Sequence, residues 1–208
     1  MPRLVVYLAI SLTIGITAFF AWEMVYPSHP ASAPVATSKP AIGGPFTLVD
    51  HTGKTVTEAD FKGRFMLIFF GYTYCPDVCP TSLQTIREAM DLLDDDGKSV
   101  QPVFVSVDPG RDAPEVLKLY VEMFGRRIMG LTGTEQQIAS AAKAYGVYYA
   151  RVSEDGGKNG KGDSYLMNHS AITYLMGPGG EFLTHFSHGT KAGEMAERIR
   201  AFVKKSAM

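Results

Sequence analysis

Apolar residues are concentrated first at the start of the chain. Between Leu4 and Trp22, 15 of 19 residues are apolar and none is charged. A helix rises about 1.5 Å per residue, so this stretch crosses most of a hydrocarbon core about 30 Å thick. Arg3 lies before it and Glu23 after it, which by the positive-inside rule keeps the N-terminus in the cytoplasm. We predict a transmembrane helix and a membrane anchor over residues 1–26, with the rest of the chain exported.

A cleaved signal peptide is the alternative interpretation of this stretch. Ala31, Ser32 and Ala33 match the small-residue pattern of a cleavage site. However, the apolar run is longer than the about 7–15 residues usual for a signal peptide, and Pro34 would follow the cut. We therefore retain the uncleaved anchor as the prediction.

Residues 27–45 separate the anchor from the rest of the chain. Of these 19 residues, five are Pro, three are Ser and two are Gly. Such a composition buries too little apolar surface to offset the entropy lost on ordering. We predict a Pro-rich linker that tethers one folded domain, residues 46–208, to the membrane.

Two apolar periodicities alternate beyond the linker. Short apolar or alternating runs predict strands over residues 46–50, 54–57, 64–70, 103–107, 128–131, 146–152, 170–176 and 181–186. Apolar residues three and four apart predict amphipathic helices over residues 80–93, 114–124, 134–145 and 191–204. Strands that alternate with helices and then end in a hairpin predict an α/β domain, with a central mixed sheet and helices on both of its faces.

Composition and charge exclude several classes of protein. The 20 Lys and Arg residues and 21 Asp and Glu residues give a net charge of −1, so the chain lacks the basic excess of a nucleic-acid-binding protein. Two cysteines are too few for a disulfide-stapled miniprotein or a four-cysteine zinc site. We expect no nucleic-acid partner, and any cysteine chemistry uses one pair or two separate thiols.

Both cysteines lie at the predicted junction of a buried strand and a helix. Cys75 and Cys79 are four residues apart, a spacing that suits a disulfide or joint coordination of one metal ion. Free N–H groups and the macrodipole at a helix N-terminus favour the thiolate form. A structural disulfide is the alternative, since the exported domain enters an oxidising compartment. Closing so short a loop, however, removes comparatively little chain entropy.

A third ligand would narrow the choice of metal. Of five histidines, only His169 lies immediately before a predicted central strand, where we expect it to face the cysteine segment; a purely structural histidine is the alternative. His185 and His188 fit either a surface metal pair or a solvated turn. No proline occurs between Pro114 and Pro178, so the place where thioredoxin-type oxidoreductases carry a cis-proline holds Met-Asn-His instead. This difference favours a metal site.

Three motifs carry most of the chemistry of the chain. They are FGYTYCPDVCP at residues 70–80, VSVDPGRDAP at residues 105–114 and YLMNHS at residues 165–170. In this order and spacing they resemble the Sco/SenC family of copper chaperones, and the resemblance covers about residues 42–204. It implies a thioredoxin-like, peroxiredoxin-related fold.

The resemblance also implies which residues bind metal. Copper would be bound by Cys75, Cys79 and His169; thiolates are soft ligands suited to Cu(I), and the added imidazole also tolerates Cu(II). Asp108, in the second motif, would support His169 from outside the ligand set or shape its loop. A turn-capping Asp before Pro109 is the alternative.

Delivery of copper to the dinuclear copper centre of cytochrome c oxidase is the function that the resemblance implies. The expected partners are the copper-bearing oxidase subunit, a copper donor protein and a thioredoxin-like reductase. The alternative is a thiol-disulfide reductase that acts on the oxidase subunit, with Cys75 and Cys79 as its redox pair.

We expect a single-pass protein of the bacterial inner membrane with its domain in the periplasm, because the short N-terminus has no Arg-rich presequence; the mitochondrial intermembrane space is the alternative. The glycine-rich residues 154–163 predict a loop that orders on metal loading.

Overall fold

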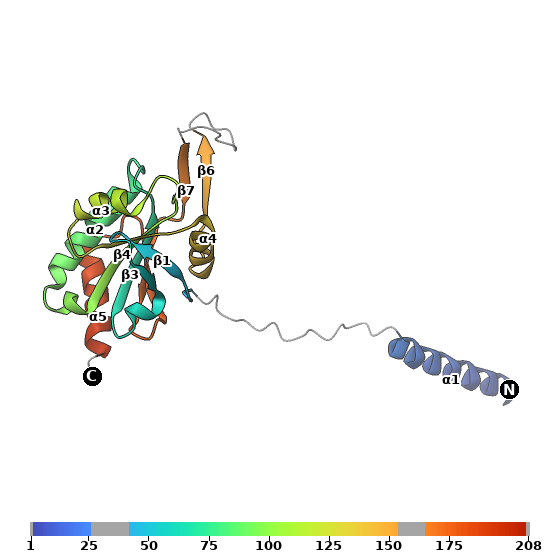
Figure 1. The fold of residues 1–208 in the computed structure, drawn as a ribbon. Helices are drawn as coiled ribbons and strands as arrows, with labels where there is room; N and C mark the ends of the chain where they lie inside the picture. Colours follow the sequence, from blue (N-terminus) through green and yellow to red (C-terminus); the bar gives the residue numbers. More distant parts are fainter. Residues whose placement is uncertain (1, 26–41, 154–164, 207–208) are drawn as a thin grey trace. The chain divides into compact units, whose positions relative to one another are not determined.

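The computed structural model describes residues 2–25, 42–153 and 165–206, in two compact units, Met1–Lys39 and Pro40–Met208. The first unit contains one helix, α1 (Pro2–Val25) (Figure 1). Within the described residues, no helix is both long and apolar enough to cross a membrane. The anchor therefore stays a prediction, and residues 27–41 of the expected linker lie outside the described residues.

A seven-stranded sheet forms the centre of the second unit, in the order β2-β1-β5-β4-β3-β8-β9. Its strands are β1 (Thr47–Asp50), β2 (Thr55–Thr57), β3 (Phe65–Gly71), β4 (Val100–Ser106), β5 (Met129–Thr132), β8 (Ile172–Met176) and β9 (Phe182–Ser187). The β3–β4 and β4–β5 pairs are parallel, and the other pairs are antiparallel. The predicted mixed sheet is therefore confirmed, including its terminal hairpin.

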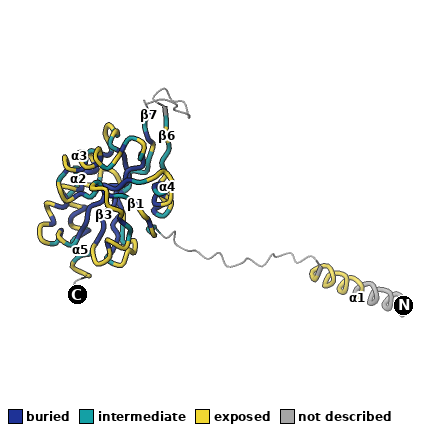
Figure 2. The backbone as a smooth tube through the Cα atoms, in the orientation of Figure 1, coloured by how far each residue is buried: buried dark blue, intermediate teal, exposed yellow. Residues whose placement is uncertain are grey.

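Helices and short 3-10 turns connect these strands. The four helices of this unit are α2 (Val78–Leu93), α3 (Pro114–Glu122), α4 (Glu135–Ala144) and α5 (Ala192–Ser206), and the turns are η1 (Glu58–Phe61) and η2 (Asp96–Ser99). Helix α2 packs on α5, whereas α3 lies against β5 and α4 against β1. Every residue of β3 and β4 is buried (Figure 2), so both faces of the sheet are covered, as the continuous apolar runs predicted.

A local sequence signal explains where helix α4 begins. The side chain of Thr134 accepts a hydrogen bond from the backbone of Gln137, and the side chain of Gln137 accepts one from the backbone of Thr134. This capping box satisfies free N–H groups at the start of α4. Helix α2 begins at Val78, two residues earlier than predicted, with Asp77 at its cap position. Cys79 therefore lies in the first helical turn instead of before the helix.

The predicted strand at residues 146–152 does not join the central sheet. Among the described strands, β6 (Tyr149–Ser153) pairs only with β7 (Tyr165–His169), and we call this two-stranded antiparallel sheet the β6–β7 ribbon (Figure 1). His169 is thus the last residue of a strand and lies opposite Tyr149. The sequence pattern missed β7 because it is short and follows the glycine-rich residues. The expected mobile loop, residues 154–163, lies outside the described residues.

Candidate metal centre

The three ligands expected from the sequence come together at one point of the second unit. The ligand atoms of Cys75, Cys79 and His169 all lie within 4.8 Å of one another, and among the described residues this is the one group of its kind. The Sγ atom of Cys79 is 3.3 Å from Nε2 of His169. Both cysteines are free thiols, with Cys79 buried and Cys75 half-buried. Two sulfurs and one nitrogen form a donor set for a soft metal ion.

The end of β3 and the start of α2 position the two thiols. Strand β3 ends at Gly71, and a Cβ atom at this position would lie 2.7 Å from the Cys79 sulfur and 2.8 Å from the ring of Phe104. A side chain larger than hydrogen therefore does not fit here without displacing a metal ligand. The backbone N–H of Cys79, in the first turn of α2, donates to the Cys75 sulfur over 3.4 Å. This contact places the Cys75 sulfur at the positive end of a helix.

The two thiols differ strongly in acidity. The pKa of Cys75 is lowered to about 3, mainly by the hydrogen bond from the Cys79 thiol and also by two backbone N–H groups, whereas burial opposes this shift. The hydrogen bond to Cys75 and burial both raise the pKa of Cys79 far above its ordinary value. At neutral pH the pair therefore holds one thiolate and one thiol. Binding of a metal ion by both sulfurs must release the proton of Cys79.

The ribbon presents the imidazole in a suitable tautomer. Nδ1 of His169 is 3.2 Å from the carbonyl oxygen of Ser170, and since a carbonyl only accepts, Nδ1 carries the hydrogen. The lone pair of Nε2 then faces the cysteine sulfurs. The ring is held edge-on by Phe69 and Tyr72, with ring centroids at 6.0 Å and 5.9 Å. The donor nitrogen is thus oriented before any metal ion arrives.

Asp108 is buried, and within the described residues its carboxylate makes no hydrogen bond with His169. Its carboxylate accepts from Nε of Arg111 over 2.5 Å and from the hydroxyl of Tyr165 over 2.7 Å. The hydrogen of His169 Nδ1 goes instead to the Ser170 carbonyl. These contacts fit the expected role of Asp108 in shaping the loop. The expected support of His169 stays a prediction.

Arg111 connects the segments that carry the ligands. Its guanidinium lies 3.6 Å from the ring centroid of Tyr165 and 4.7 Å from that of Tyr74, and Nη1 donates to the Tyr165 carbonyl over 3.0 Å. Tyr74 is next to Cys75, and Tyr165 begins the strand that ends at His169. We call Asp108, Arg111 and Tyr165 the Arg111 clamp. The sequence did not indicate that Arg111 contacts the strand that carries a proposed metal ligand.

Asp112 fixes the cysteine segment to β4. This buried carboxylate accepts from the backbone and hydroxyl of Thr73, over 3.0 and 2.6 Å, and from the hydroxyl of Ser106, over 2.5 Å. Burial raises the pKa of Asp112 and outweighs these hydrogen bonds. Sequence reasoning missed this role, because the bonds to Thr73 link residues 39 positions apart.

His185 and His188, for which the sequence left a surface metal pair or a solvated turn open, each contact another side chain. His188 Nδ1 is 3.3 Å from the hydroxyl of Ser82, and the ring of His185 stacks on Phe182 at 6.4 Å. Among the described residues, neither histidine belongs to a group of three or more possible metal ligands. His29 lies outside the described residues.

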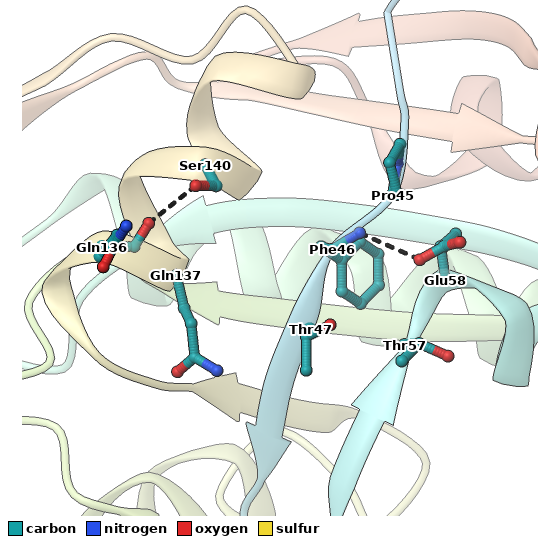
Figure 3. Close-up of a pocket in the computed structure, with 8 residues that line it drawn as sticks. All are labelled: Pro45, Phe46, Thr47, Thr57, Glu58, Gln136, Gln137 and Ser140. Atoms are coloured by element: carbon teal, nitrogen blue, oxygen red, sulfur yellow. Dashed lines mark hydrogen bonds between the residues drawn. The ribbon is translucent and has the colours of Figure 1, made fainter.

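A cavity of about 520 Å³ lies away from the metal centre, between the start of β1 and α4 (Figure 3). Two of its polar side chains are already engaged: Glu58 accepts from the backbone of Phe46 over 3.0 Å, and Ser140 donates to the Gln136 carbonyl over 2.9 Å. It contains neither a cysteine nor a histidine. We assign no chemistry to this cavity.

Known proteins resemble this chain in sequence and in fold. The SCO1/SenC family model matches residues 34–204. Human "Protein SCO1 homolog, mitochondrial" is 40% identical over 174 residues, which are 81% of this chain and 56% of that protein. Protein SenC of Rhodobacter capsulatus is 41% identical over 162 residues, 78% of this chain and 71% of that protein. The structure of Bradyrhizobium japonicum ScoI with copper bound is 41% identical, with a TM-score of 0.70 over 78% of this chain and 99% of that chain. The chain therefore spans little more than half the length of the human relative.

Proposed function

Because the chain belongs to the SCO1/SenC family, we propose that it is a copper chaperone that delivers copper to the dinuclear copper centre of cytochrome c oxidase. The convergence of Cys75, Cys79 and His169 within 4.8 Å is the observation that carries the proposal. The copper found in the Bradyrhizobium relative supports the choice of metal. In this role copper is the cargo of the protein.

The donor set suits a metal ion that must be both held and released. Two thiolates favour Cu(I), and the imidazole supplies the third donor of a trigonal site that also accepts Cu(II). Cys79 is buried, whereas Cys75 and His169 are half-buried. A ligand of the oxidase subunit therefore reaches the metal from the side of Cys75 and His169, while Cys79 holds it from behind.

Metal loading requires both thiols in reduced form. In an oxidising compartment Cys75 and Cys79 would be oxidised to a disulfide, so a thioredoxin-like reductase has to supply electrons before a copper donor protein supplies the metal. Loading also releases the proton that Cys79 holds at neutral pH. These requirements are the basis for the two partners that we propose besides the oxidase subunit.

We also propose that residues 1–26 anchor the protein in the bacterial inner membrane, with the domain in the periplasm. The support is the uncharged apolar stretch from Leu4 to Trp22. The full chain is then expected to stay in the membrane pellet after an alkaline wash, and a chain lacking residues 1–26 is expected in the supernatant. Release of the full chain by the wash would contradict the anchor.

Metal titration of the reduced full chain tests the copper site. We expect one copper ion per chain, whether Cu(I) or Cu(II) is titrated. The His169→Ala variant should lose Cu(II) affinity by about hundredfold or more, because a direct ligand is removed. The matched control is His185→Ala, which removes an imidazole that stacks on Phe182. Stoichiometric Cu(II) binding that is unchanged in His169→Ala would contradict the three-ligand site.

Reduction of the oxidase subunit is the second candidate function. The low pKa of the half-buried Cys75 favours it, because such a thiolate can attack a disulfide and the neighbouring Cys79 can then resolve the mixed disulfide. This activity needs both thiols but not the imidazole. Disulfide reduction in the purified subunit that survives His169→Ala and disappears in Cys75→Ser would favour the reductase; dependence on His169 would favour the chaperone.

A further inference from the structure

A basic pocket lies at the opposite end of the central strands from the metal centre. Arg64 directly precedes β3, and Gly71 at the other end of that strand contacts the metal-binding sulfur of Cys79. Seven strand residues span about 20 Å, so the pocket and the metal centre are separate sites. Its volume is about 210 Å³, and its polar lining residues are His51, Arg64, Gln101, Arg126 and Arg127.

Positive charge in this pocket has no carboxylate to balance it. Three arginines line the pocket, and no Asp or Glu does. Arg64 and Arg126 are exposed, and neither side chain makes an ion pair or a side-chain hydrogen bond with another described residue. Arg127 uses one nitrogen to donate to the Gly97 carbonyl. At least two complete guanidinium groups therefore remain available to an anion.

The frame of the pocket is fixed by hydrogen bonds. The buried side chain of Gln101 donates to the carbonyl of Arg127 over 2.8 Å and so holds the loop that carries Arg126 and Arg127. The backbone N–H of Gly130 donates to Nδ1 of His51 over 3.0 Å. In the neutral imidazole this bond leaves the hydrogen on Nε2. The arginine loop and the histidine tautomer are thus set before a ligand binds.

We propose that this basic pocket binds a phosphate group, carried by an anionic phospholipid headgroup or by free inorganic phosphate. Guanidinium groups match the geometry of phosphate oxygens, and hydrogen bonds between charged groups are stronger than neutral ones. The imidazole N–H of His51 adds a further donor. The ligands Cys75, Cys79 and His169 do not line the pocket, so this inference does not depend on the proposed copper function.

Calorimetric titration of the full chain in neutral detergent micelles with inorganic phosphate is the first arm of the test. We expect one phosphate per chain, and the Arg64→Gln/Arg126→Gln variant should bind phosphate at least about tenfold more weakly, because two charge-assisted contacts are lost. The matched control, Lys118→Gln/Lys143→Gln, removes the same charge from exposed positions outside the pocket. Equal phosphate affinity in all three proteins would overturn the proposal. Unchanged Cu(I) stoichiometry shows that the variants are folded.

The second arm identifies the source of the phosphate. The full chain is placed in nanodiscs of phosphatidylcholine alone or with phosphatidylglycerol, and hydrogen exchange of residues 126–130 is compared. Slower exchange with phosphatidylglycerol, in the wild type and the lysine control but not in Arg64→Gln/Arg126→Gln, supports the lipid headgroup. Phosphate binding in the first arm without this lipid effect supports free phosphate. If neither arm depends on the two arginines, the proposal is wrong.

Discussion

The metal centre joins two parts of the fold that are held in different ways. Cys75 and Cys79 lie where the buried strand β3 meets α2. Asp112 accepts from the backbone of Thr73 in this segment, and the absence of a side chain at Gly71 leaves room for the Cys79 sulfur. His169 ends the β6–β7 ribbon, which does not join the central sheet. The thiols are thus part of the core, whereas the imidazole is added from a separate element. We infer that the thiols set the affinity for copper and that the ribbon sets the coordination that distinguishes Cu(II) from Cu(I).

Removing a thiol should cause the largest loss of copper affinity. In Cys79→Ser a hard hydroxyl replaces a soft thiolate, so Cu(I) affinity should fall by more than the about 10–100-fold expected from losing a supporting residue. Competition with a chromophoric Cu(I) chelator measures the loss. Thermal unfolding of the metal-free variant provides the folding control. A Cu(I) affinity within tenfold of the wild type would show that the imidazole, not the thiol pair, dominates.

We call the junction of β3 and α2 that carries Cys75 and Cys79 the rigid half of the metal centre. A side chain at Gly71 should destabilise this half. In Gly71→Ala the new methyl group meets the Cys79 sulfur at 2.7 Å, so we expect a loss of unfolding free energy of about 1–3 kcal/mol and weaker Cu(I) binding. Urea denaturation measures the first effect. Gly193→Ala is the matched control, because a Cβ atom there meets nothing within 4 Å. Equal stability of the two variants would mean that the junction is not tightly packed.

Loss of the Arg111 side chain should displace the β6–β7 ribbon and leave the two thiols in place. Arg111→Ala removes the guanidinium that contacts Tyr165 and Tyr74, so Cu(II) affinity should fall about tenfold or more while Cu(I) affinity changes by less. The Cu(II) EPR spectrum and hydrogen exchange of β7 in the metal-free protein report the displaced ribbon.

Arg111→Lys separates charge from geometry in the same clamp. Lysine keeps the charge but loses the planar fork that pairs with Asp108 and stacks on Tyr165. It should therefore behave like Arg111→Ala. Equal losses of Cu(I) and Cu(II) affinity in both variants would contradict a role confined to the ribbon.

The pH dependence of stability should report the different acidities of the two thiols. Since the folded pair loses its first proton near pH 3, and unfolded thiols only near pH 8.5, the folded state binds fewer protons between these values and its stability rises with pH. Above this window the high pKa of Cys79 leaves the folded state with more protons, so stability falls. Urea denaturation from pH 4 to 10, compared with Cys75→Ser/Cys79→Ser, measures the difference. A difference that does not vary with pH would contradict the split acidity.

The rigid half was predictable from sequence because its signals are local. The apolar run of β3, the spacing of Cys75 and Cys79 and the capping box of α4 all lie within short windows. The three proposed ligands were expected from the resemblance to the family, and the structure brings them together. What short windows miss is contact between distant segments, such as the bonds of Asp112 to Thr73.

The β6–β7 ribbon could not be predicted from local sequence patterns. Strand β7 is five residues long and pairs only with β6, so neither length nor periodicity separates it from the loop before β8. The contact of Arg111 with Tyr165 spans 54 residues, and no local pattern marks it. Gly71 is similar, because a glycine at the end of a strand gives no hint that a sulfur atom occupies the space beside it.

The aromatic rings around His169 make the position of the β6–β7 ribbon measurable. Phe69 and Tyr72 belong to the rigid half and lie edge-on to the imidazole at 6.0 and 5.9 Å. Aromatic ring currents shift the resonances of nearby protons according to distance and angle. The proton frequencies of His169 in the metal-free protein therefore measure where the ribbon lies relative to the core, without a probe, a label or a bound metal.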